Sequence, residues 1–254
     1  MTGRKPPRPD RDEQRQEEVW SSLGADDPDW AVLTVRDRRH RGWEDDLSEF
    51  YETGEAAVSE CLELARPTGA ARALDYGAGT GRLSFALAKR FAHVTAVDIS
   101  PGMRKTLNER AAAAGITNVT TVAPSEVDEH GEHDFAVSLL VLQHLPDLQA
   151  VDAAVGVIAG ALRPGGVAVI ELPERVKTWR ARIQPRFRAY RLLRTLGWSH
   201  QRLHRRGLSG ISMLVVPAPQ AERLLVGNGL QVLTHATSGD DGYDYARWVV
   251  RRDG

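Results

Sequence analysis

The chain of 254 residues contains a single cysteine, Cys61. One cysteine cannot form an internal disulfide or supply a multi-cysteine metal site, so we expect a reduced, cytoplasmic setting and no bound metal. Long apolar runs are also missing: the longest, residues 153–162, is far shorter than the roughly 18 residues that span a bilayer. The basic N-terminus has no apolar stretch behind it, which argues against a signal peptide.

Net charge is nearly absent. The 33 lysines and arginines and the 34 aspartates and glutamates sum to −1, so the overall balance predicts no partner. Hydrophobic residues make up 42% of the chain and charged residues 26%, as in soluble globular proteins. This composition excludes collagen-like, wholly disordered and membrane-spanning classes.

The residue pattern divides the chain into three parts. Residues 1–18 hold too little apolar surface to offset the entropy of ordering, so we expect a disordered tail. Residues 19–70 place apolar side chains three and four positions apart, which predicts an N-terminal helical segment. From residue 71 to 254 short apolar runs alternate with helical stretches. That alternation predicts a doubly wound α/β domain around a mostly parallel sheet.

A glycine-rich turn is the most informative motif. Residues 73–84 read ALDYGAGTGRLS, an apolar run that reaches Asp75 and continues into three alternating glycines before a helix. Such glycines let the backbone approach a ligand closely, with amides at the following helix N-terminus. Arg82 stands where a dinucleotide-binding G-x-G-x-x-G fingerprint needs its third glycine, so the sequence disfavours that cofactor. The next apolar run ends in Asp98, where a carboxylate could accept both hydroxyls of a ribose.

With these residues the sequence resembles the class I S-adenosylmethionine-dependent methyltransferases, in their small-molecule branch. The resemblance covers roughly residues 45–252 and includes, in the family's order, LDYGAGTG, VTAVDIS, DFAVSLLVLQHLPD and LRPGGVAVIELP. It implies a Rossmann-like, seven-stranded, mostly parallel sheet, with residues 71–254 as the methyltransferase domain. It also implies S-adenosylmethionine as cofactor and S-adenosylhomocysteine as product.

The resemblance assigns cofactor contacts residue by residue. Asp75 and the glycines would surround the methionine part, Asp98 would hold the ribose, and Ile99 and Met103 would flank the adenine. The upstream segment also resembles the small-molecule branch, and there Tyr51 and Thr53 would close over the methionine end or simply pack the first helix. The full set is Tyr51, Thr53, Asp75, Gly77, Ala78, Gly79, Gly81, Asp98, Ile99, Met103, Ser125, Glu126 and Leu140.

The acceptor site is expected beyond the carboxyl ends of the strands, as in other open α/β sheets. His144, after the fourth strand, is the first candidate for a general base because histidine titrates near neutral pH. The alternative is a structural histidine in the H-L-P-D turn. Glu171, after the fifth strand, is the second candidate, and its alternative is a polar group bonded to backbone. The candidate substrate-binding residues are Gln143, Arg186, Tyr190, Asp241 and Tyr243.

Acidic residues are absent from residues 175–206, which contain eleven arginines or lysines. Apolar side chains recur there every three or four residues, so we expect a basic, amphipathic helical lid over residues 174–208, interrupted at Pro185. We name residues 174–208 the basic segment. Three uses stay open: attraction of an anionic acceptor, contact with an anionic membrane surface, or a solvated face.

The sequence therefore predicts a methyltransferase that acts on an oxygen or nitrogen of a small, anionic metabolite, including the metabolites of natural-product biosynthesis. One alternative is a nucleic-acid methyltransferase that docks through the basic segment. That alternative is disfavoured because the fourth strand does not end in an N-P-P-Y-like turn. A third reading is a cofactor-binding protein with a regulatory role and no turnover. The residues do not indicate an oligomeric state.

Overall fold

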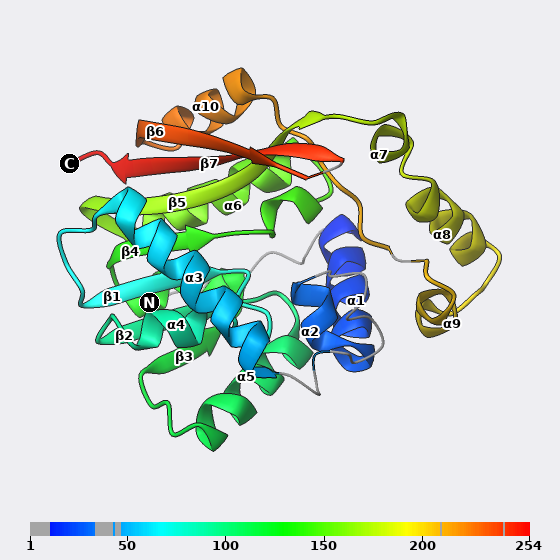
Figure 1. Cartoon of the computed structure of the whole chain (residues 1–254), viewed down its shortest axis with the longest axis horizontal. Coiled ribbons are helices and arrows are strands. Elements are labelled where there is room, and N and C mark those ends of the chain that lie inside the picture. The colour runs from blue at the N-terminus through cyan, green and yellow to red at the C-terminus, as the bar shows by residue number, and fades with distance from the viewer. Residues whose placement is uncertain (1–10, 34–42, 44–46, 209, 241) are drawn as a thin grey trace, which may run out of the picture.

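A computed structural model describes residues 11–33, 43, 47–208, 210–240 and 242–254. Its centre is a sheet of seven strands in the order β3-β2-β1-β4-β5-β7-β6, in which only β7 runs antiparallel to its neighbours (Figure 1). The strands are β1 Arg72–Tyr76, β2 His93–Val97, β3 Val119–Val122, β4 His133–Ser138, β5 Leu162–Val176, β6 Leu230–Gly239 and β7 Tyr243–Arg252. This sheet confirms the predicted fold class.

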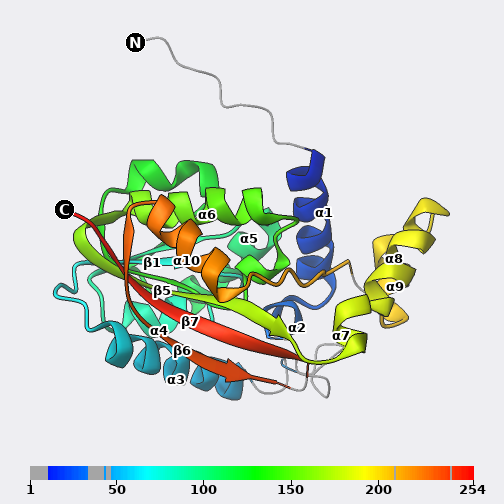
Figure 2. The same cartoon turned by 90° about the horizontal axis from the view of Figure 1, so that it is seen from above.

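Helices cover both faces of the sheet (Figure 2). The helices α3 (Leu47–Ala65) and α4 (Ser84–Ala88) pack on one face, and α6 (Leu148–Ala161) and α10 (Ala218–Gly227) pack on the other. Burial on both faces explains why the strands read as nearly continuous apolar runs. Side chains alternate along β1, so Leu74 and Tyr76 face α6 while Asp75 points toward the face covered by α3 and α4.

The N-terminal part differs from its prediction. The helix α1 (Arg11–Asp26) includes residues 11–18, where the sequence favoured a disordered tail, and residues 1–10 lie outside the described residues. The reason is packing further along the same helix: Leu23 is buried against Met103 of α5 (Pro101–Ala113), with Val19 and Trp20 beside it. A helix held at one end extends into polar residues that would not order alone.

The basic segment forms three short helices, α7 (Trp179–Ile183), α8 (Pro185–Thr195) and α9 (His200–Arg205). Gln184 takes a left-handed conformation, with φ of 48°, and the chain begins a new helix at Pro185. In both views α1 lies between the sheet and the helices α8 and α9 (Figure 1, Figure 2). No described helix is long and apolar enough to cross a membrane.

Candidate functional site

The glycine turn after β1 has a backbone that other residues cannot adopt without strain. Gly77, Gly79 and Gly81 have φ values of 86°, 54° and 98°. A Cβ atom at Gly77 would lie 2.2 Å from a Val141 methyl group, and one at Gly79 would lie 2.3 Å from a Val32 methyl group. The turn therefore depends on glycine both for its conformation and for the close approach of neighbouring segments.

Asp98, directly after β2, fastens this turn. Its Oδ2 atom accepts a hydrogen bond from the Gly79 amide at 2.8 Å, and its Oδ1 atom accepts one from the Ser100 amide at 2.8 Å. Burial raises the pKa of Asp98, although the two amide bonds and Arg104 act in the opposite direction. The same carboxylate lies at the cavity described below, as the ribose assignment requires.

Asp75 is buried and only half satisfied. Its Oδ2 atom accepts a hydrogen bond from the Ser84 hydroxyl at 2.6 Å, while its Oδ1 atom has no hydrogen-bond partner among the described residues. Burial raises the pKa of Asp75 to about 6. Asp75 is not among the residues that line the cavity described below.

A cavity of about 340 Å³ lies at the carboxyl ends of β1, β2 and β4. Of the predicted cofactor residues, those that line it are Gly77, Ala78, Gly79, Asp98, Ile99, Met103, Ser125 and Leu140. Leu140 has a φ of 62°, a rare conformation for a leucine and typical of residues held at functional sites. The structure thus brings together residues that follow four separate strands, since Ser125 comes after β3.

Other predicted cofactor residues serve neighbouring elements. Tyr51 packs its ring against Phe50 and Phe85, and the Thr53 hydroxyl donates to the Phe50 carbonyl of its own helix at 2.7 Å. Glu126 accepts a hydrogen bond from the Ala123 amide at 2.7 Å, which caps its own helical turn. These three side chains do not line the cavity.

The cavity has a cover that the sequence reading missed. Trp20 of α1, together with Ala31 and Val32 of α2 (Pro28–Val32), lines it from the side opposite the sheet. The Asp29 carboxylate anchors α2 because it accepts hydrogen bonds from Thr80 of the glycine turn and from Arg110 of α5. The available signal was the apolar spacing of residues 19, 20 and 23, followed by proline at a helix start.

His144 is engaged within the protein. Its Nδ1 atom lies 2.9 Å from the Ser212 carbonyl, its Nε2 atom lies 3.3 Å from the Gln143 amide nitrogen, and its ring centre lies 5.4 Å from that of Trp20. Burial lowers the pKa of His144 to about 4. A neutral ring with both nitrogens occupied favours the structural interpretation over a general base.

Glu171 belongs to an ion-pair network. Its Oε2 atom accepts a hydrogen bond from Arg247 Nε at 2.8 Å, and Arg247 also pairs with Glu60 of α3 at 2.5 Å. The Glu171 side chain is buried. Because Arg247 already occupies this carboxylate, the geometry favours a structural role.

The remaining substrate-binding candidates do not meet at the cavity. Arg186 is exposed, and Tyr190 is buried inside the basic segment beside His200. The Tyr243 hydroxyl donates to the Ala181 carbonyl at 2.9 Å, which ties β7 to α7. Asp241 lies outside the described residues.

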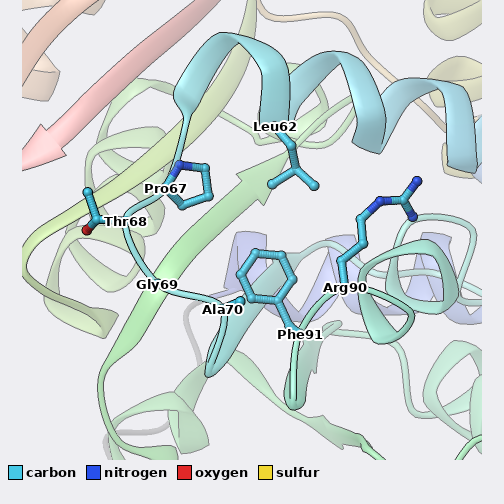
Figure 3. Close-up of a pocket in the computed structure, with 7 residues that line it drawn as sticks. All are labelled: Leu62, Pro67, Thr68, Gly69, Ala70, Arg90 and Phe91. Carbon is cyan, nitrogen blue, oxygen red and sulfur yellow. The ribbon is translucent and has the colours of Figure 1, made fainter.

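A second, shallower pocket of about 360 Å³ lies at the amino ends of β1 and β2 (Figure 3). Its lining residues are Leu62, Pro67, Thr68, Gly69, Ala70, Arg90 and Phe91. Arg90 is fully engaged there, since it donates to Glu55, Ser59 and the Ala86 carbonyl. The pocket lies away from the glycine turn and holds no unsatisfied group of the predicted site.

Residues 73–166 match the family model described as a methyltransferase domain. This stretch of the chain is therefore similar to a methyltransferase domain. This match confirms the resemblance that the sequence indicated, and it includes the glycine turn, Asp98 and the end of β4.

Relatives of the methyltransferase domain include two proteins named ubiquinone biosynthesis O-methyltransferase. The one from Xanthomonas euvesicatoria is 35% identical over 112 residues, or 43% of this chain and 44% of that protein. The one from Xylella fastidiosa is 34% identical over 103 residues, or 39% of this chain and 41% of that protein. The chain therefore matches less than half the length of these curated relatives.

Solved structures share the fold across nearly the whole chain. Magnesium protoporphyrin IX methyltransferase from Synechocystis, with bound S-adenosylhomocysteine, aligns with a TM-score of 0.63 at 18% identity, over 95% of this chain and 100% of that one. The N-methyltransferase NodS from Bradyrhizobium japonicum aligns with a TM-score of 0.57 at 16% identity, over 96% and 100%. At these identities the alignments establish the fold alone.

Proposed function

We propose that the protein is an S-adenosylmethionine-dependent methyltransferase that acts on an anionic oxygen of a small metabolite. The observation that carries this proposal is the cradle at the glycine turn. A Cβ atom at Gly77 or Gly79 has no room, Asp98 lies at the cavity, and one buried oxygen of Asp75 has no partner among the residues that the structure describes. These features fit a ligand with a ribose and an amino-acid end.

Each part of the cradle has a role toward the cofactor. The backbone at Gly77 and Gly79 would approach the methionine part, Asp98 would accept the ribose hydroxyls, and Ile99 and Met103 would pack against the adenine. When bound, S-adenosylmethionine supplies a methyl group on a positively charged sulfur, and its transfer leaves a neutral thioether. The protein must then orient the acceptor and exclude water.

The class of acceptor is argued from the hydrogen-bond partners of the two candidate bases. His144 has both ring nitrogens engaged, and Glu171 is paired with Arg247. An acceptor oxygen that is already ionised, as in a carboxylate or an acidic phenol, has no proton to remove. We therefore favour methylation of an anionic oxygen over methylation of a protonated amine or a neutral alcohol.

The positive charge of the basic segment supports an anionic acceptor through long-range electrostatic attraction rather than through direct contact. Its residues do not line the cavity, but Arg186 and Arg188 are exposed and have no ion-pair partner among the residues that the structure describes. Unpaired positive charge close to the α1 side of the molecule raises the local concentration of anions. Salt weakens this effect because the screening length falls below about 10 Å at high ionic strength.

Calorimetry with S-adenosylhomocysteine tests the cofactor part of the proposal. We expect micromolar binding by the wild-type chain and at least about tenfold weaker binding by Gly77→Ala, because the added methyl group would collide with Val141. The matched control is Gly115→Ala: Gly115 also has a positive φ, of 67°, but a Cβ atom there meets nothing within 4 Å. Failure of the wild-type chain to bind would refute the proposal.

Transfer of a labelled methyl group tests the acceptor part. Carboxylates and acidic phenols should be methylated faster than amines or neutral alcohols of similar size. In Arg186→Gln/Arg188→Gln, KM for an anionic acceptor should rise severalfold at low salt while kcat stays unchanged. Equal KM values of the wild type and the double variant at all salt concentrations would refute anion attraction and leave the methyltransferase proposal standing.

A further inference from the structure

The basic segment presents apolar side chains to solvent as well as positive charge. Leu196, Trp179 and Leu192 are 67%, 65% and 63% exposed, and they are the most exposed large apolar side chains among the residues that the structure describes. In both views α8 and α9 lie at the outer edge of the molecule, beyond α1 (Figure 1, Figure 2). Attraction of a small anion requires only the charge, so it leaves these apolar side chains unexplained.

This exposure does not come from a failure of the segment to pack. Tyr190 of α8 is buried, and Leu203 of α9 is fully buried. Between α7 and α8 the Gln184 side chain makes two hydrogen bonds to Met213. Its amide nitrogen donates to the Met213 carbonyl at 2.7 Å, and its carbonyl oxygen accepts from the Met213 amide at 3.0 Å. The basic segment therefore buries one set of apolar side chains and holds another set toward solvent.

The outward face of α8 combines leucine with arginine. Leu192 and Leu196, the last of which caps the helix, are four residues apart and so lie on the same side of it. Arg188 precedes Leu192 by one turn on that side, and Arg191 lies beside the leucines. Both arginines are exposed. The helix thus has an apolar stripe with arginine along its edge on the side that faces away from Tyr190.

The charge of this surface is of one sign. Residues 179–206 contain nine arginines and no acidic residue, and none of the nine has an ion-pair partner among the residues that the structure describes. The guanidinium carbons of Arg202 and Arg206 lie 4.3 Å and 4.7 Å from the ring centre of Trp198. An anionic partner would therefore meet no carboxylate of residues 179–206.

We propose that the basic segment docks on the surface of an anionic lipid bilayer, with Leu192 and Leu196 in contact with lipid. A bilayer interface accommodates all three components of this surface. Arginines bind lipid phosphates, tryptophan lies at the level of the headgroups, and leucine enters the boundary of the acyl chains. The outer surface of a nucleic acid is phosphate and sugar, which pair with arginine but offer an exposed leucine no apolar contact. The inference goes beyond the proposed methyl transfer and does not depend on it.

Flotation of the full chain with lipid vesicles tests the inference. We expect binding to phosphatidylcholine vesicles that contain about 30% phosphatidylglycerol, and at least about tenfold weaker binding to phosphatidylcholine alone. Leu192→Asn/Leu196→Asn should weaken binding to the anionic vesicles by about tenfold or more, even at low salt, because it removes the apolar contact and keeps every charge. Arg188→Gln/Arg191→Gln should weaken it by a similar factor at low salt. Melting temperatures equal to that of the wild type check that the variants fold.

The matched control is Arg223→Gln/Val226→Asn on α10. It removes one exposed arginine and one valine that is 58% exposed, both outside the basic segment, and should bind vesicles as the wild type does. The inference is overturned if the wild-type chain does not bind anionic vesicles at low salt, or if the double leucine variant binds them fully. Tighter binding to single-stranded RNA than to these vesicles, lost only in the arginine variant, would assign the surface to nucleic acid instead.

Discussion

A buried ion pair between Asp29 and Arg110 anchors α2, one of the two helices of the cover, and its removal should loosen that helix. The Asp29 carboxylate accepts Arg110 NH1 on one oxygen at 2.6 Å and Arg110 NH2 on the other at 2.8 Å. The Thr80 hydroxyl donates to the first oxygen at 2.8 Å. Asp29 is 2% exposed, so its charge is almost fully removed from water. Asp29→Asn keeps the shape of the side chain and removes the charge.

The free-energy cost of Asp29→Asn depends on the interactions that the asparagine keeps. Removing one member of a buried pair typically costs about 3–5 kcal/mol. The Arg110 side chain is 22% exposed, so water recovers part of the loss, and the asparagine oxygen still accepts one hydrogen bond. We therefore expect a cost of about 2 kcal/mol, which corresponds to a roughly 30-fold larger open population of α2.

Hydrogen exchange followed by mass spectrometry measures this opening. The amides of Ala31 and Leu33, which donate within α2, should exchange about 30-fold faster in Asp29→Asn, while the sheet keeps its protection. Asp152→Asn makes the same charge change on the exposed surface of α6 and should leave α2 unchanged. Wild-type exchange of α2 in Asp29→Asn would show that this ion pair does not hold the cover.

Two further predictions concern buried ionisable groups. Since the folded-state pKa of Asp75 is raised to about 6, ionisation opposes folding: the ligand-free protein should lose up to about 3 kcal/mol as pH rises from 4 to 7. In urea unfolding, the free energy of unfolding of Asp75→Asn should not show this decrease between pH 4 and pH 7. A decrease as large as in the wild type would contradict the prediction. Burial raises the pKa of the Cys61 thiol to about 12, so a disulfide reagent should label it only after unfolding. Rapid labelling of the native protein would disprove its burial.

Some features of the site could be predicted because they depend on neighbours in sequence. The glycine spacing requires a particular backbone turn whatever surrounds it, and the alternation of apolar runs predicts a sheet covered on both faces. Asp98 could be predicted as well, because a residue directly after a strand of a parallel sheet lies at its carboxyl edge. The cavity indeed has Gly77, Gly79 and Asp98 on its wall.

Hydrogen-bond partners could not be predicted in this way. By residue type His144 is a candidate base, but in the structure the carbonyl of Ser212, 68 residues away, lies within hydrogen-bond distance of its Nδ1 atom. By residue type Glu171 is also a candidate base, but in the structure Arg247, 76 residues away, pairs with its carboxylate. Residue type predicts what a side chain can do, and its partners determine whether it is free to do so.

The sequence alone therefore determined the sheet, the glycine turn and the position of Asp98 at the edge of the sheet, because each follows from local backbone preference and apolar periodicity. Only the tertiary structure decided what covers the site and which charges are satisfied. Asp29 reaches Arg110 across 81 residues, and Arg247 reaches Glu171 across 76 residues. Burial and pairing are properties of the assembled chain, since the desolvation of a charge depends on every segment that packs around it.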